Sequence, residues 1–527
     1  MDDSVIIVGA GLAGLTAAIT LAEHGQKSIL VSNMPSERAQ SVLAEGGINA
    51  ALDVKGEDDS PEQHWEDTMQ AGKNLEDPEV VRGLTEAAPE MIHRLAALGV
   101  PFQTAGFDLD QRNFGGQKKK RTCYVKSSIG KMLMTALIDE TRKYEAQGLV
   151  ERDTTGVFTQ LVIGEQSGQR ICAGCLITDR LTGETQKLYG PVLLACGGMN
   201  GLFGNHTTGT VINTGDAAAA VFSQGVAFAD LEFIQYHPTT VAAAGKRLLV
   251  SEAARGEGGR LYVKRNGQPW YFMEEKYPEL GNLMPRDVVS REMFDVVRRE
   301  DCDNQVYLDL TGLSDNVWDE KLPDLRRECQ EYAGIDPAET PVPVSPGIHY
   351  FMGGIAVDTQ HKTSLPGLYA AGECAAIYHG ANRLGGNSTL GAIYGGKQAA
   401  VSIISSPKPE LVNAEAGPAI SMDPLQLLDS TERSMQAALL SGLGIERDAE
   451  SLQESSENIQ ALEAGADERH RRRLLLAEGM LRAALFRKET RGAQIRTDYP
   501  EENPAFQKKT IIQYRDGKIS VHLEGEA

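Results

Sequence analysis

Long apolar runs are missing from this sequence of 527 residues. A helix that crosses a membrane needs about 18 or more consecutive apolar residues, and no stretch approaches that length. We therefore expect no direct membrane insertion. The chain begins Met1-Asp2-Asp3 and has no basic segment before its first apolar run, so we expect no secretory signal peptide and a cytoplasmic location.

Positive charge is scarce relative to negative charge. The chain has 52 Lys and Arg against 73 Asp and Glu, which gives a formal net charge of −21 and a pI of about 5.0. Such a field repels nucleic acid and anionic membrane surfaces, so neither is expected as a partner. It also repels anionic substrates at long range, and an anion site would need a local cluster of Arg and His.

Cysteine is sparse and forms no regular framework. The chain has seven cysteines, and an odd, scattered set of this kind is not typical of a secreted disulfide scaffold. Cys172 and Cys175 form the single CxxC, within an alternating stretch, Arg170 to Thr178, that predicts a strand. Because no second pair completes a zinc site, we expect no metal here.

The rest of the composition is that of an ordinary globular protein with a surplus of glycine. Hydrophobic residues make up 41% of the chain and charged residues 24%, enough for a large core and, at this length, for roughly two to four domains. The 55 glycines predict many tight turns and close approaches of the backbone to a bound molecule.

The first 32 residues carry a strand–helix–strand pattern with glycines at the first turn. Residues 4–8 and 28–32 are apolar, as in buried parallel strands. An apolar helix is expected over residues 15–24, directly after Gly9-Ala-Gly11-Leu-Ala-Gly14. GxGxxG alone is a weak signal, but its position between a strand and a helix identifies a dinucleotide-binding βαβ unit.

Each of these glycines has a physical task. Gly9 allows the tight turn, Gly11 removes the side chain that would block a pyrophosphate, and Gly14 lets the helix pack closely on the strand. The helix N-terminus then offers free N–H groups and a positive dipole end to the phosphates. Ser32 departs from the NAD pattern, which has Asp or Glu at the second strand end, so a generic NAD site is not favoured.

The middle of the chain alternates between helical and strand patterns. Helical patterns extend to about residue 98 and cover residues 129–147, whereas residues 150–195 alternate like a β-meander. Residues 226–345 form a block with its own Gly and Pro turns, and the buried-strand pattern returns at residues 367–373. From about residue 424 to 487 the chain is helical and charged, and Asp516-Gly517 then predicts a hairpin.

These blocks predict an α/β fold in which two separated segments build one Rossmann-type nucleotide-binding domain, with an inserted α+β capping domain and a C-terminal helical domain. The expected boundaries are residues 1–225 and 346–405 for the two segments of the nucleotide-binding domain, 226–345 for the cap and 406–527 for the helical domain with its hairpin. A cap over a cofactor would exclude water during the reaction.

Six motifs occur in order along the chain. They are Ser41-Val-Leu-Ala-Glu45-Gly-Gly47-Ile, Gln235-Tyr-His237-Pro-Thr239, Glu252-Ala-Ala-Arg255-Gly-Glu-Gly-Gly259, Pro285-Arg286-Asp287-Val-Val-Ser-Arg291, His349-Tyr-Phe-Met-Gly-Gly354 and His379-Gly-Ala-Asn-Arg383-Leu-Gly-Gly-Asn-Ser388. Together they resemble the fumarate reductase/succinate dehydrogenase flavoprotein family, which includes L-aspartate oxidase. The resemblance covers nearly the whole chain, including Arg487-Lys-Glu-Thr-Arg491-Gly, and six ordered motifs are far more specific than any one.

The resemblance implies that the nucleotide-binding domain binds FAD. The residues implied are Gly9, Gly11, Gly14, Ser32, Ser41, Gly46, Gly47, Asp216, Glu373 and Ser388. It accounts for Ser32, because this family commonly has Ser at that strand end, and it implies that Glu373 accepts hydrogen bonds from a hydroxyl on the flavin side. Asp216 also has a structural interpretation, as a helix N-cap after Thr214-Gly215, and both roles are compatible.

A dicarboxylate substrate needs two carboxylate clamps, for which Arg supplies a planar fork. The candidates are Arg383, His237 and His349, with Ser251 as a hydroxyl donor. A single His is more often a structural residue than a ligand, but three basic groups in three family motifs favour substrate binding.

Reduction of fumarate by a hydride from flavin N5 leaves carbanion character at the adjacent carbon, so a proton must arrive on the opposite face. The resemblance implies Arg286 as the donor, resupplied through Arg255 and Glu252. Because the ordinary pKa of Arg lies above about 12, proton transfer must be coupled to hydride arrival in a dry site. The alternative for Arg286 is an ion pair with Asp287 or another carboxylate at the domain surface.

Three positions distinguish members of the family. Gln40 stands where members with covalent flavin have a linking His, which predicts non-covalent FAD and, by the resemblance, favours fumarate reduction. Glu45 stands where fumarate reductases tend to have Glu and succinate dehydrogenases Gln. Phe114 matches the dicarboxylate enzymes, whereas L-aspartate oxidases usually have a Glu for the substrate ammonium, which Phe would leave uncompensated.

The leading hypothesis is a flavoprotein subunit that interconverts fumarate and succinate in anaerobic respiration, biased to fumarate reduction. An iron–sulfur partner would supply its electrons, because this chain carries no cluster motif, and would be its route to a membrane. L-Aspartate oxidase of NAD biosynthesis remains an alternative, favoured by the length of 527 residues. A non-catalytic flavin-binding scaffold, the third alternative, is disfavoured by the intact set of charged residues.

Two basic runs, Lys118–Arg121 and Arg469–Arg473, have no place in this hypothesis. We expect them to lie on solvated faces. Docking of an acidic partner is the alternative, and nothing else in the sequence supports it.

Overall fold

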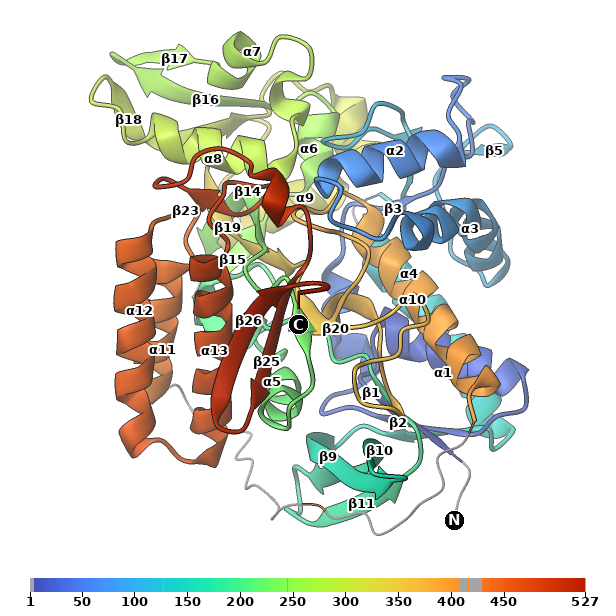
Figure 1. The fold of residues 1–527 in the computed structure, drawn as a ribbon. Coiled ribbons are helices and arrows are strands. Elements are labelled where there is room, and N and C mark those ends of the chain that lie inside the picture. The colour runs from blue at the N-terminus through green and yellow to red at the C-terminus, as the bar shows by residue number, and fades with distance from the viewer. Residues whose placement is uncertain (1–3, 127, 244, 408–415, 417–428, 527) are drawn as a thin grey trace.

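The computed structural model describes residues 4–126, 128–243, 245–407, 416 and 429–526 (Figure 1). Met1-Asp2-Asp3, on which the expectation about a signal peptide rests, lies outside these residues. Residues 424–428, at the expected start of the helical tail, lie outside them as well.

A five-stranded parallel sheet carries the glycine-rich turn. Its order is β21-β12-β1-β2-β8, with bounds Leu368–Ala370, Val192–Leu194, Val5–Val8, Ser28–Val31 and Val150–Asp153. β1, β12 and β21 are buried throughout, as expected for a parallel sheet covered on both faces. Because β21 comes from the second segment and the other strands from the first, the predicted Rossmann-type α/β class is confirmed.

Helix α1 (Leu12–Glu23) follows β1 directly and begins three residues before the expected Leu15. It starts early because Gly11 serves as its N-cap and the next eleven residues are all buried. α1 packs between α10 (Asn387–Ser405) and α4 (Ile129–Ala146), and Figure 1 shows α1 and α10 side by side.

Two further helices, α2 (Pro61–Ala71) and α3 (Pro78–Ala97), make up the helical region expected before residue 98. Ser60 and Asp77 cap their N-termini and each is followed by Pro, which is preorganised for the first helical position. The short strands of this region are β3 (Ile48–Asn49), β4 (Thr104–Ala105), β5 (Asp108–Leu109), β6 (Gln111–Arg112) and β7 (Thr122–Cys123).

The expected meander over residues 150–195 is correct only for its central part. β9 (Gly156–Gln166), β10 (Gln169–Asp179) and β11 (Thr185–Tyr189) form an antiparallel sheet, whereas the flanking β8 and β12 belong to the parallel sheet. β10 is buried on both faces from residue 171 to 178, so its cysteines are core residues. Among the described residues, no group of three or more His, Cys, Asp or Glu is arranged to hold a metal ion.

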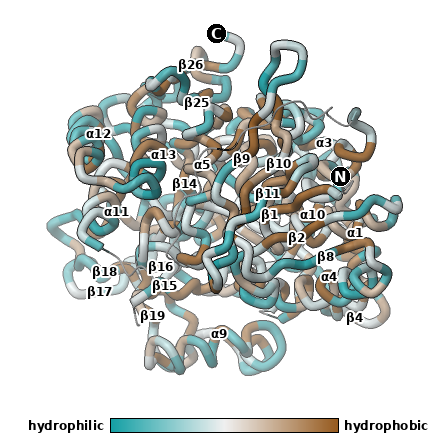
Figure 2. The backbone as a smooth tube through the Cα atoms, turned by 90° about the horizontal axis from the view of Figure 1, so that it is seen from below, coloured by the Kyte–Doolittle hydropathy of each residue, from teal (hydrophilic) through white to brown (hydrophobic). Residues whose placement is uncertain are grey.

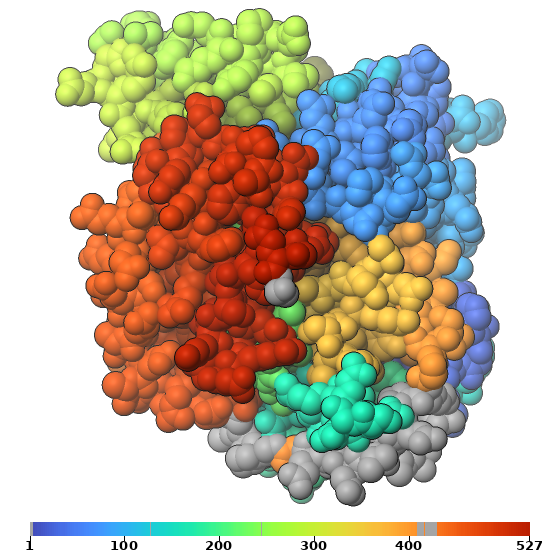
Figure 3. All heavy atoms as spheres, viewed as in Figure 1, coloured from blue at the N-terminus to red at the C-terminus, as the bar shows by residue number. Residues whose placement is uncertain are grey.

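The inserted block has a sheet and a core of its own. Its six strands, in the order β15-β14-β19-β18-β16-β17, are Lys246–Leu249, Ile234–Ala243, Val342–Phe351, Cys302–Asp309, Arg260–Arg265 and Gln268–Trp270. Its helices are α6 (Glu252–Gly256), α7 (Phe272–Lys276), α8 (Arg286–Val296) and α9 (Pro323–Glu328). The part of this block around β16, β17, β18 and α7 lies at the upper left in Figure 1, and β19 runs across the expected boundary at residue 345. The same part is at the upper left in Figure 3.

Three helices and a hairpin end the chain. The helices are α11 (Ser430–Gly442), α12 (Ala449–Leu462) and α13 (Glu468–Phe486). β25 (Thr510–Arg515) and β26 (Lys518–Leu523) form the predicted hairpin, with Asp516 and Gly517 both at positive φ, as a two-residue turn of this kind requires. β25 also pairs with β13 (Phe228–Ala229), in a sheet completed by β20 (Gly354–Ala356) and β22 (Ala375–Ala376).

The two basic runs pair with carboxylates of this chain. Arg121 is fully buried, and its guanidinium lies 2.8 Å from both Asp59 and Asp67. The solvated face expected for the first run is therefore wrong at Arg121, because a buried charge needs a partner. The solvated face expected for the second run is also wrong at Arg473, which is 3% exposed and donates to Asp216 at 3.1 Å, and this bond ties α13 to the start of α5 (Asp216–Ser223).

Apolar residues are concentrated in the parallel sheet and α1, whereas the outer helix α12 is mostly hydrophilic (Figure 2). No helix within the described residues is both long and apolar enough to span a bilayer.

A buried ion network fastens the C-terminal region to the turn between β13 and β14. Arg487, just after α13, is fully buried. Its Nε donates to Glu232 at 2.5 Å, its Nη1 to Glu489 at 2.9 Å and its Nη2 to Thr510 at 2.7 Å. In the segment that begins at Arg487 and resembles the family, the contacts of Arg487 therefore serve to hold the fold together.

Replacing Arg487 by Met should destabilise the protein strongly. Glu232 would be left buried without its cation, and breaking a buried ion pair from one side costs about 3–5 kcal/mol. We expect a clearly lower urea midpoint of unfolding, followed by circular dichroism. Lys488→Met alters the exposed neighbouring residue and should change stability by less than about 0.5 kcal/mol. Equal midpoints for the two variants would contradict this account.

Candidate active site

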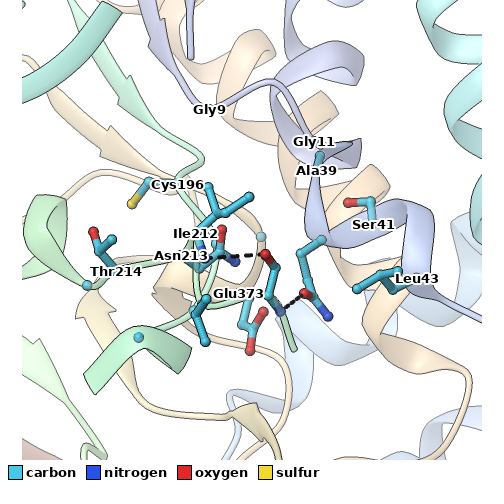
Figure 4. A pocket seen from close by; sticks show the side chains of 18 of the residues that line it. Gly9, Gly11, Ala39, Ser41, Leu43, Cys196, Ile212, Asn213, Thr214 and Glu373 are labelled. Carbon is cyan, nitrogen blue, oxygen red and sulfur yellow. Dashed lines mark hydrogen bonds between the residues drawn. The ribbon is translucent and has the colours of Figure 1, made fainter. Parts of the chain in front are cut away.

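One cavity of about 740 Å³ extends from the N-terminus of α1 to the cap. Figure 4 shows Ser41 on the side of Gly11, and Glu373 between Ser41 and the loop that carries Asn213. Of all the residues predicted to bind cofactor or substrate or to act in catalysis, only Gly14 and Arg255 do not line this cavity. Sequence positions more than 350 residues apart are therefore brought to one site.

The glycine-rich turn has the geometry that a diphosphate requires. Gly9 has φ +112°, and a Cβ added there would lie 2.1 Å from the carbonyl oxygen of Ala195. A Cβ at Gly14 would lie 1.9 Å from the carbonyl oxygen of Gly9, so the helix packs tightly on the turn. A Cβ at Gly11 would meet only Ser41 Oγ, at 3.1 Å, because this glycine borders the cavity. The three expected tasks of these glycines thus match their surroundings.

Two serines flank this turn. Ser41, in the short 3-10 helix η2 (Gln40–Leu43), accepts a hydrogen bond from the Leu12 N–H at 3.2 Å, at the start of α1. Ser32 directly follows β2 and donates its hydroxyl hydrogen to the carbonyl oxygen of Met34 at 2.7 Å. Its oxygen keeps acceptor capacity for a ribose hydroxyl, without the carboxylate of NAD sites. The residues at this end of the cavity fit an FAD molecule.

Two acidic residues line the cavity beyond the turn. Glu373 follows β21, and its carboxylate accepts the Phe351 N–H at 3.2 Å. Burial raises the pKa of Glu373 to about 7. Asp216 is the first helical residue of α5, after the N-cap Gly215, so its interpretation as an N-cap is wrong. Burial acts to raise its pKa, but Arg473 and Arg469 hold that pKa below the ordinary value.

The loop after η2 and the start of α10 complete the cofactor wall. Gly46 lies against Phe114, since an added Cβ would come within 2.6 Å of the ring, and Gly47 has φ +148° beside Thr122. Ser388 is in the first turn of α10 and lines the cavity, so the N-terminus of a second helix faces it.

Two histidines form the cap-side wall. His237 on β14 and His349 on β19 have ring centroids 5.1 Å apart. Burial lowers the pKa of both rings well below the usual value, and Arg286 adds to both shifts, so both are neutral. The Thr239 N–H donates to Nδ1 of His237 at 3.3 Å, which leaves the proton on Nε2 and makes this nitrogen a donor.

Two arginines lie beside these histidines and are almost completely buried. Nη1 of Arg286 and Nη2 of Arg383 both donate to Oε1 of Gln235, each at 2.9 Å. Burial lowers the pKa of Arg383 to about 9, with Arg286 as the next cause, so Arg383 stays charged at neutral pH. Its Nε has no hydrogen-bond partner among the described residues, and Arg383 itself lines the cavity.

Gln235 and Tyr350 contribute to this site without having been predicted. Besides accepting from both arginines, Gln235 donates to the Arg383 carbonyl oxygen at 2.8 Å. The guanidinium of Arg383 lies 4.4 Å from the ring centroid of Tyr350. Both residues belong to recognised motifs, and Gln235 lies two positions before His237 on the same strand, which was a usable signal.

Glu252 joins Arg286 to Arg255. One carboxylate oxygen accepts from Arg286 at 2.7 Å and the other from Arg255 at 2.9 Å. Burial acts to raise the pKa of Glu252, but Arg286 and Arg255 hold it below the ordinary value, so the group is ionised. Asp287 instead accepts from Asn382 at 3.0 Å, so the alternative pairing of Arg286 with Asp287 is wrong.

Two glycine loops approach Glu252 from outside the cap. A Cβ at Gly115 would lie 2.4 Å from Oε1 of Glu252, and one at Gly385 would lie 2.6 Å from Oε2. Phe114, 1% exposed, belongs to the hydrophobic core of the cap and also contacts Gly46. The loop after η2, the loop before α10 and the cap therefore meet at Phe114.

Three further predicted positions line the same cavity. Ser251 is the N-cap of α6 and accepts the Ala253 N–H at 3.4 Å, so its hydroxyl hydrogen remains free to donate. Gln40 accepts the Thr210 N–H through its side-chain oxygen. Burial raises the pKa of Glu45 well above its usual range, and the cap carboxylates Glu328 and Asp324 add to the shift.

Comparisons with known proteins agree with this geometry. A family model described as "FAD binding domain" matches residues 4–389, and one described as "Fumarate reductase flavoprotein C-term" matches residues 468–526. The chain is 44% identical to the succinate dehydrogenase flavoprotein subunit of Bacillus subtilis over 75% of this chain and 68% of that protein. It is 32% identical to L-aspartate oxidase of Streptomyces coelicolor over 98% of this chain and 93% of that protein.

The fold has a similar solved counterpart. A structure of E. coli quinol fumarate reductase with a mutation in FrdA superposes with a TM-score of 0.85 and 28% sequence identity. The match covers 99% of this chain and 96% of that chain.

The raised pKa of Glu373 predicts how stability depends on pH. In the flavin-free folded protein this carboxyl keeps its proton up to about pH 7, whereas the ordinary pKa of a Glu carboxyl is 4.5. The folded state then binds more protons than the unfolded state, so this group makes stability fall as pH rises from about 4.5 to about 7 and level off above. We expect the thermal midpoint of flavin-free Glu373→Gln to fall less between pH 5 and pH 8 than that of the native protein. Parallel curves would refute the assignment.

Proposed function

Because the chain belongs to the fumarate reductase and succinate dehydrogenase flavoprotein family, which also includes L-aspartate oxidases, we propose that it interconverts fumarate and succinate and is biased to fumarate reduction. The observation that carries this proposal is the arrangement of two buried arginines and two neutral histidines on one side of a single cavity. Glu252 adds a carboxylate to this group, and that carboxylate accepts a hydrogen bond from Arg286.

The carboxylates of the substrate are assigned to the unpaired donors of this wall. Arg383 offers its Nε and a planar fork, and His237 offers its Nε2–H. His349, held by Thr208 at 2.7 Å, and the Ser251 hydroxyl supply the remaining donors. The net charge of −21 opposes anion entry at long range, so the local positive charge of Arg286 and Arg383 must hold the dicarboxylate.

Arg286 is proposed to protonate the carbon next to the one that receives hydride. Bound FAD supplies the hydride in this chemistry. Glu252 fixes the guanidinium of Arg286 through Nε at 3.0 Å and Nη2 at 2.7 Å, while Nη1 is held by Gln235. After turnover, the ionised Glu252 can accept a proton from Arg255 on its one oxygen and pass a proton to the neutral Arg286 on its other, which restores the charge of Arg286. Arg286, 6% exposed, works in a dry site, where such a transfer is favoured.

The cofactor is proposed to be bound without a covalent link. Gln40 stands at the linking position, and an amide cannot form the histidyl bond to flavin. Its side-chain oxygen is engaged by the Thr210 N–H, which gives this residue a structural task at the cavity wall. The lower flavin potential implied by the family resemblance supports fumarate reduction over succinate oxidation.

Electrons are proposed to come from a separate iron–sulfur subunit, which would also provide any membrane association. The support is that the seven cysteines form no cluster motif and that, in the described residues, none belongs to a group arranged for a metal.

L-Aspartate oxidase is the second candidate. One observation favours it. The match to the L-aspartate oxidase of Streptomyces coelicolor covers almost the full length of this chain, whereas the match to the succinate dehydrogenase subunit of Bacillus subtilis covers three quarters of it. Phe114 argues against it, because its buried ring cannot compensate the ammonium of L-aspartate.

Turnover with reduced viologen as electron donor separates the candidates. We expect the FAD-loaded protein to reoxidise viologen on addition of fumarate and to leave L-aspartate unchanged. Arg286→Gln should lower the fumarate rate by at least about 100-fold, the range lost with a general acid, while FAD remains bound.

Arg291→Gln is the matched control, because Arg291 lies on the same helix and is exposed. It should retain the native rate. Formation of iminoaspartate from L-aspartate without fumarate reduction would assign the chain to the second candidate. An unchanged fumarate rate in Arg286→Gln would remove Arg286 from its role.

Acid precipitation tests the non-covalent cofactor. Denaturation destroys the cavity, so FAD held only by hydrogen bonds and packing should appear entirely in the supernatant. The measurement is flavin absorbance in the supernatant and flavin fluorescence of the protein band on a denaturing gel. A fluorescent protein band would show a covalent link at a residue other than Gln40.

A further inference from the structure

Arg180 lines the cavity, and no role assigned above uses it. It directly follows β10, and its N–H donates to the carbonyl oxygen of Thr155 at 3.0 Å, next to the start of β9. Its side chain is partly buried, and Nε is closed to solvent with no hydrogen-bond partner among the described residues. No described partner therefore fixes the guanidinium through Nε, and its planar face can turn toward a ligand in the cavity.

The fold identifies which part of FAD lies near Arg180. In a βαβ unit, the diphosphate lies at the first turn and the adenosine ribose at the end of the second strand, which is Ser32 here. β8 pairs with β2, and the Ser32 N–H donates to the Asp153 carbonyl oxygen at 2.8 Å. The connection from β8 to β9 therefore lies beside the strand end that holds the ribose. Arg180 is on the adenosine side of the diphosphate, and the substrate arginines are on the flavin side.

The surroundings of Arg180 suit a flat aromatic base. Gly156, Val157 and Phe158, at the start of β9, line the same cavity. A Cβ at Gly156 would lie 2.4 Å from Oδ2 of Asp153 and 2.7 Å from side-chain atoms of both Val31 and Ile177, so this wall is closely packed and cannot carry a larger residue. A tight wall that includes Val157 and Phe158, with a planar cation beside it, provides the contacts that an adenine ring prefers, because guanidinium groups stack on aromatic faces.

Two other arginines of the cavity are already engaged. Arg469 and Arg473 line it too, but both form ion pairs with Asp216, at 3.0 and 3.1 Å. Nε of Arg180, by contrast, has no hydrogen-bond partner among the described residues. In a chain with a net charge of −21, a cation at this corner also offsets the repulsion that the FAD diphosphate meets.

We infer that Arg180 holds the adenosine half of FAD, with its guanidinium packed on the adenine ring. The inference rests on FAD as the cofactor and adds a binding residue to those assigned above. It does not depend on the identity of the substrate.

The test compares release of FAD with binding of FMN, which lacks the adenosine. In Arg180→Gln we expect FAD to dissociate roughly tenfold faster, the size of one good cation–π contact, as measured by the rise of flavin fluorescence after dilution of the holoenzyme. Affinity of the flavin-free protein for FMN should stay within about twofold of native, and affinity for ADP should fall about as much as that for FAD.

Two further variants make this comparison decisive. Arg180→Lys keeps the charge and the aliphatic stem but loses the planar fork, so its FAD release should lie between native and Arg180→Gln. Arg170→Gln is the matched control, since Arg170 is on β10 and its guanidinium donates to the Gln224 carbonyl oxygen away from this cavity. FAD release in Arg170→Gln should equal native.

Two outcomes would overturn the inference. Equal weakening of FMN and FAD in Arg180→Gln would mean a general loss of structure, and native-like FAD release would mean no contact. Failure of the native holoenzyme to reduce fumarate would remove the proposed activity, but a selective effect on FAD and ADP would still support Arg180 as an adenosine contact.

Discussion

Two guanidinium groups side by side in a buried wall are the constraint on which the site depends. Arg286 and Arg383 repel each other, and burial deprives both of hydration. The side-chain oxygen of Gln235 accepts from both, and Glu252 neutralises Arg286. No described residue pairs with Nε of Arg383. The wall therefore keeps an excess of positive charge, which a bound dicarboxylate would neutralise, inside a protein that is otherwise strongly acidic.

This constraint shapes the backbone around it. Glu252 can reach both arginines only because Gly115 and Gly385 leave room for its carboxylate, since a Cβ on either would collide with it. Both glycines lie outside the cap, in loops that also contact the cofactor end of the cavity. Phe114 sits at this contact with its ring in the core of the cap. The position of the cap is therefore coupled to the proposed proton path through Glu252, because the contacts of Phe114 and of these two glycines hold both in place.

The parts of this structure that follow local rules could be predicted from the sequence. The βαβ unit, the hairpin at Asp516-Gly517 and the helix over 129–146 depend on periodicity, glycine and turn residues that lie close together in the chain. Gln235 as a bridge and Arg121 as a buried cation escaped prediction, because their partners lie about 50 or more residues away and no local pattern indicates them. The sequence predicted Asp216 as the N-cap of α5. Gly215, at φ +83°, takes the N-cap position instead, and Asp216 is the first residue of the helix.

The strand order of the parallel sheet has a consequence for how the chain acquires its cofactor during synthesis. β1 is completed within the first eight residues, but its neighbour β12 ends at residue 194 and the edge strand β21 at residue 370. Ser388 and the start of α10 emerge later still. β1 can pair with β2 early in translation, but its other edge stays open until β12 has emerged, and no nascent segment shorter than about three quarters of the protein can enclose the flavin. Assembly of this holoenzyme is therefore a late event in synthesis.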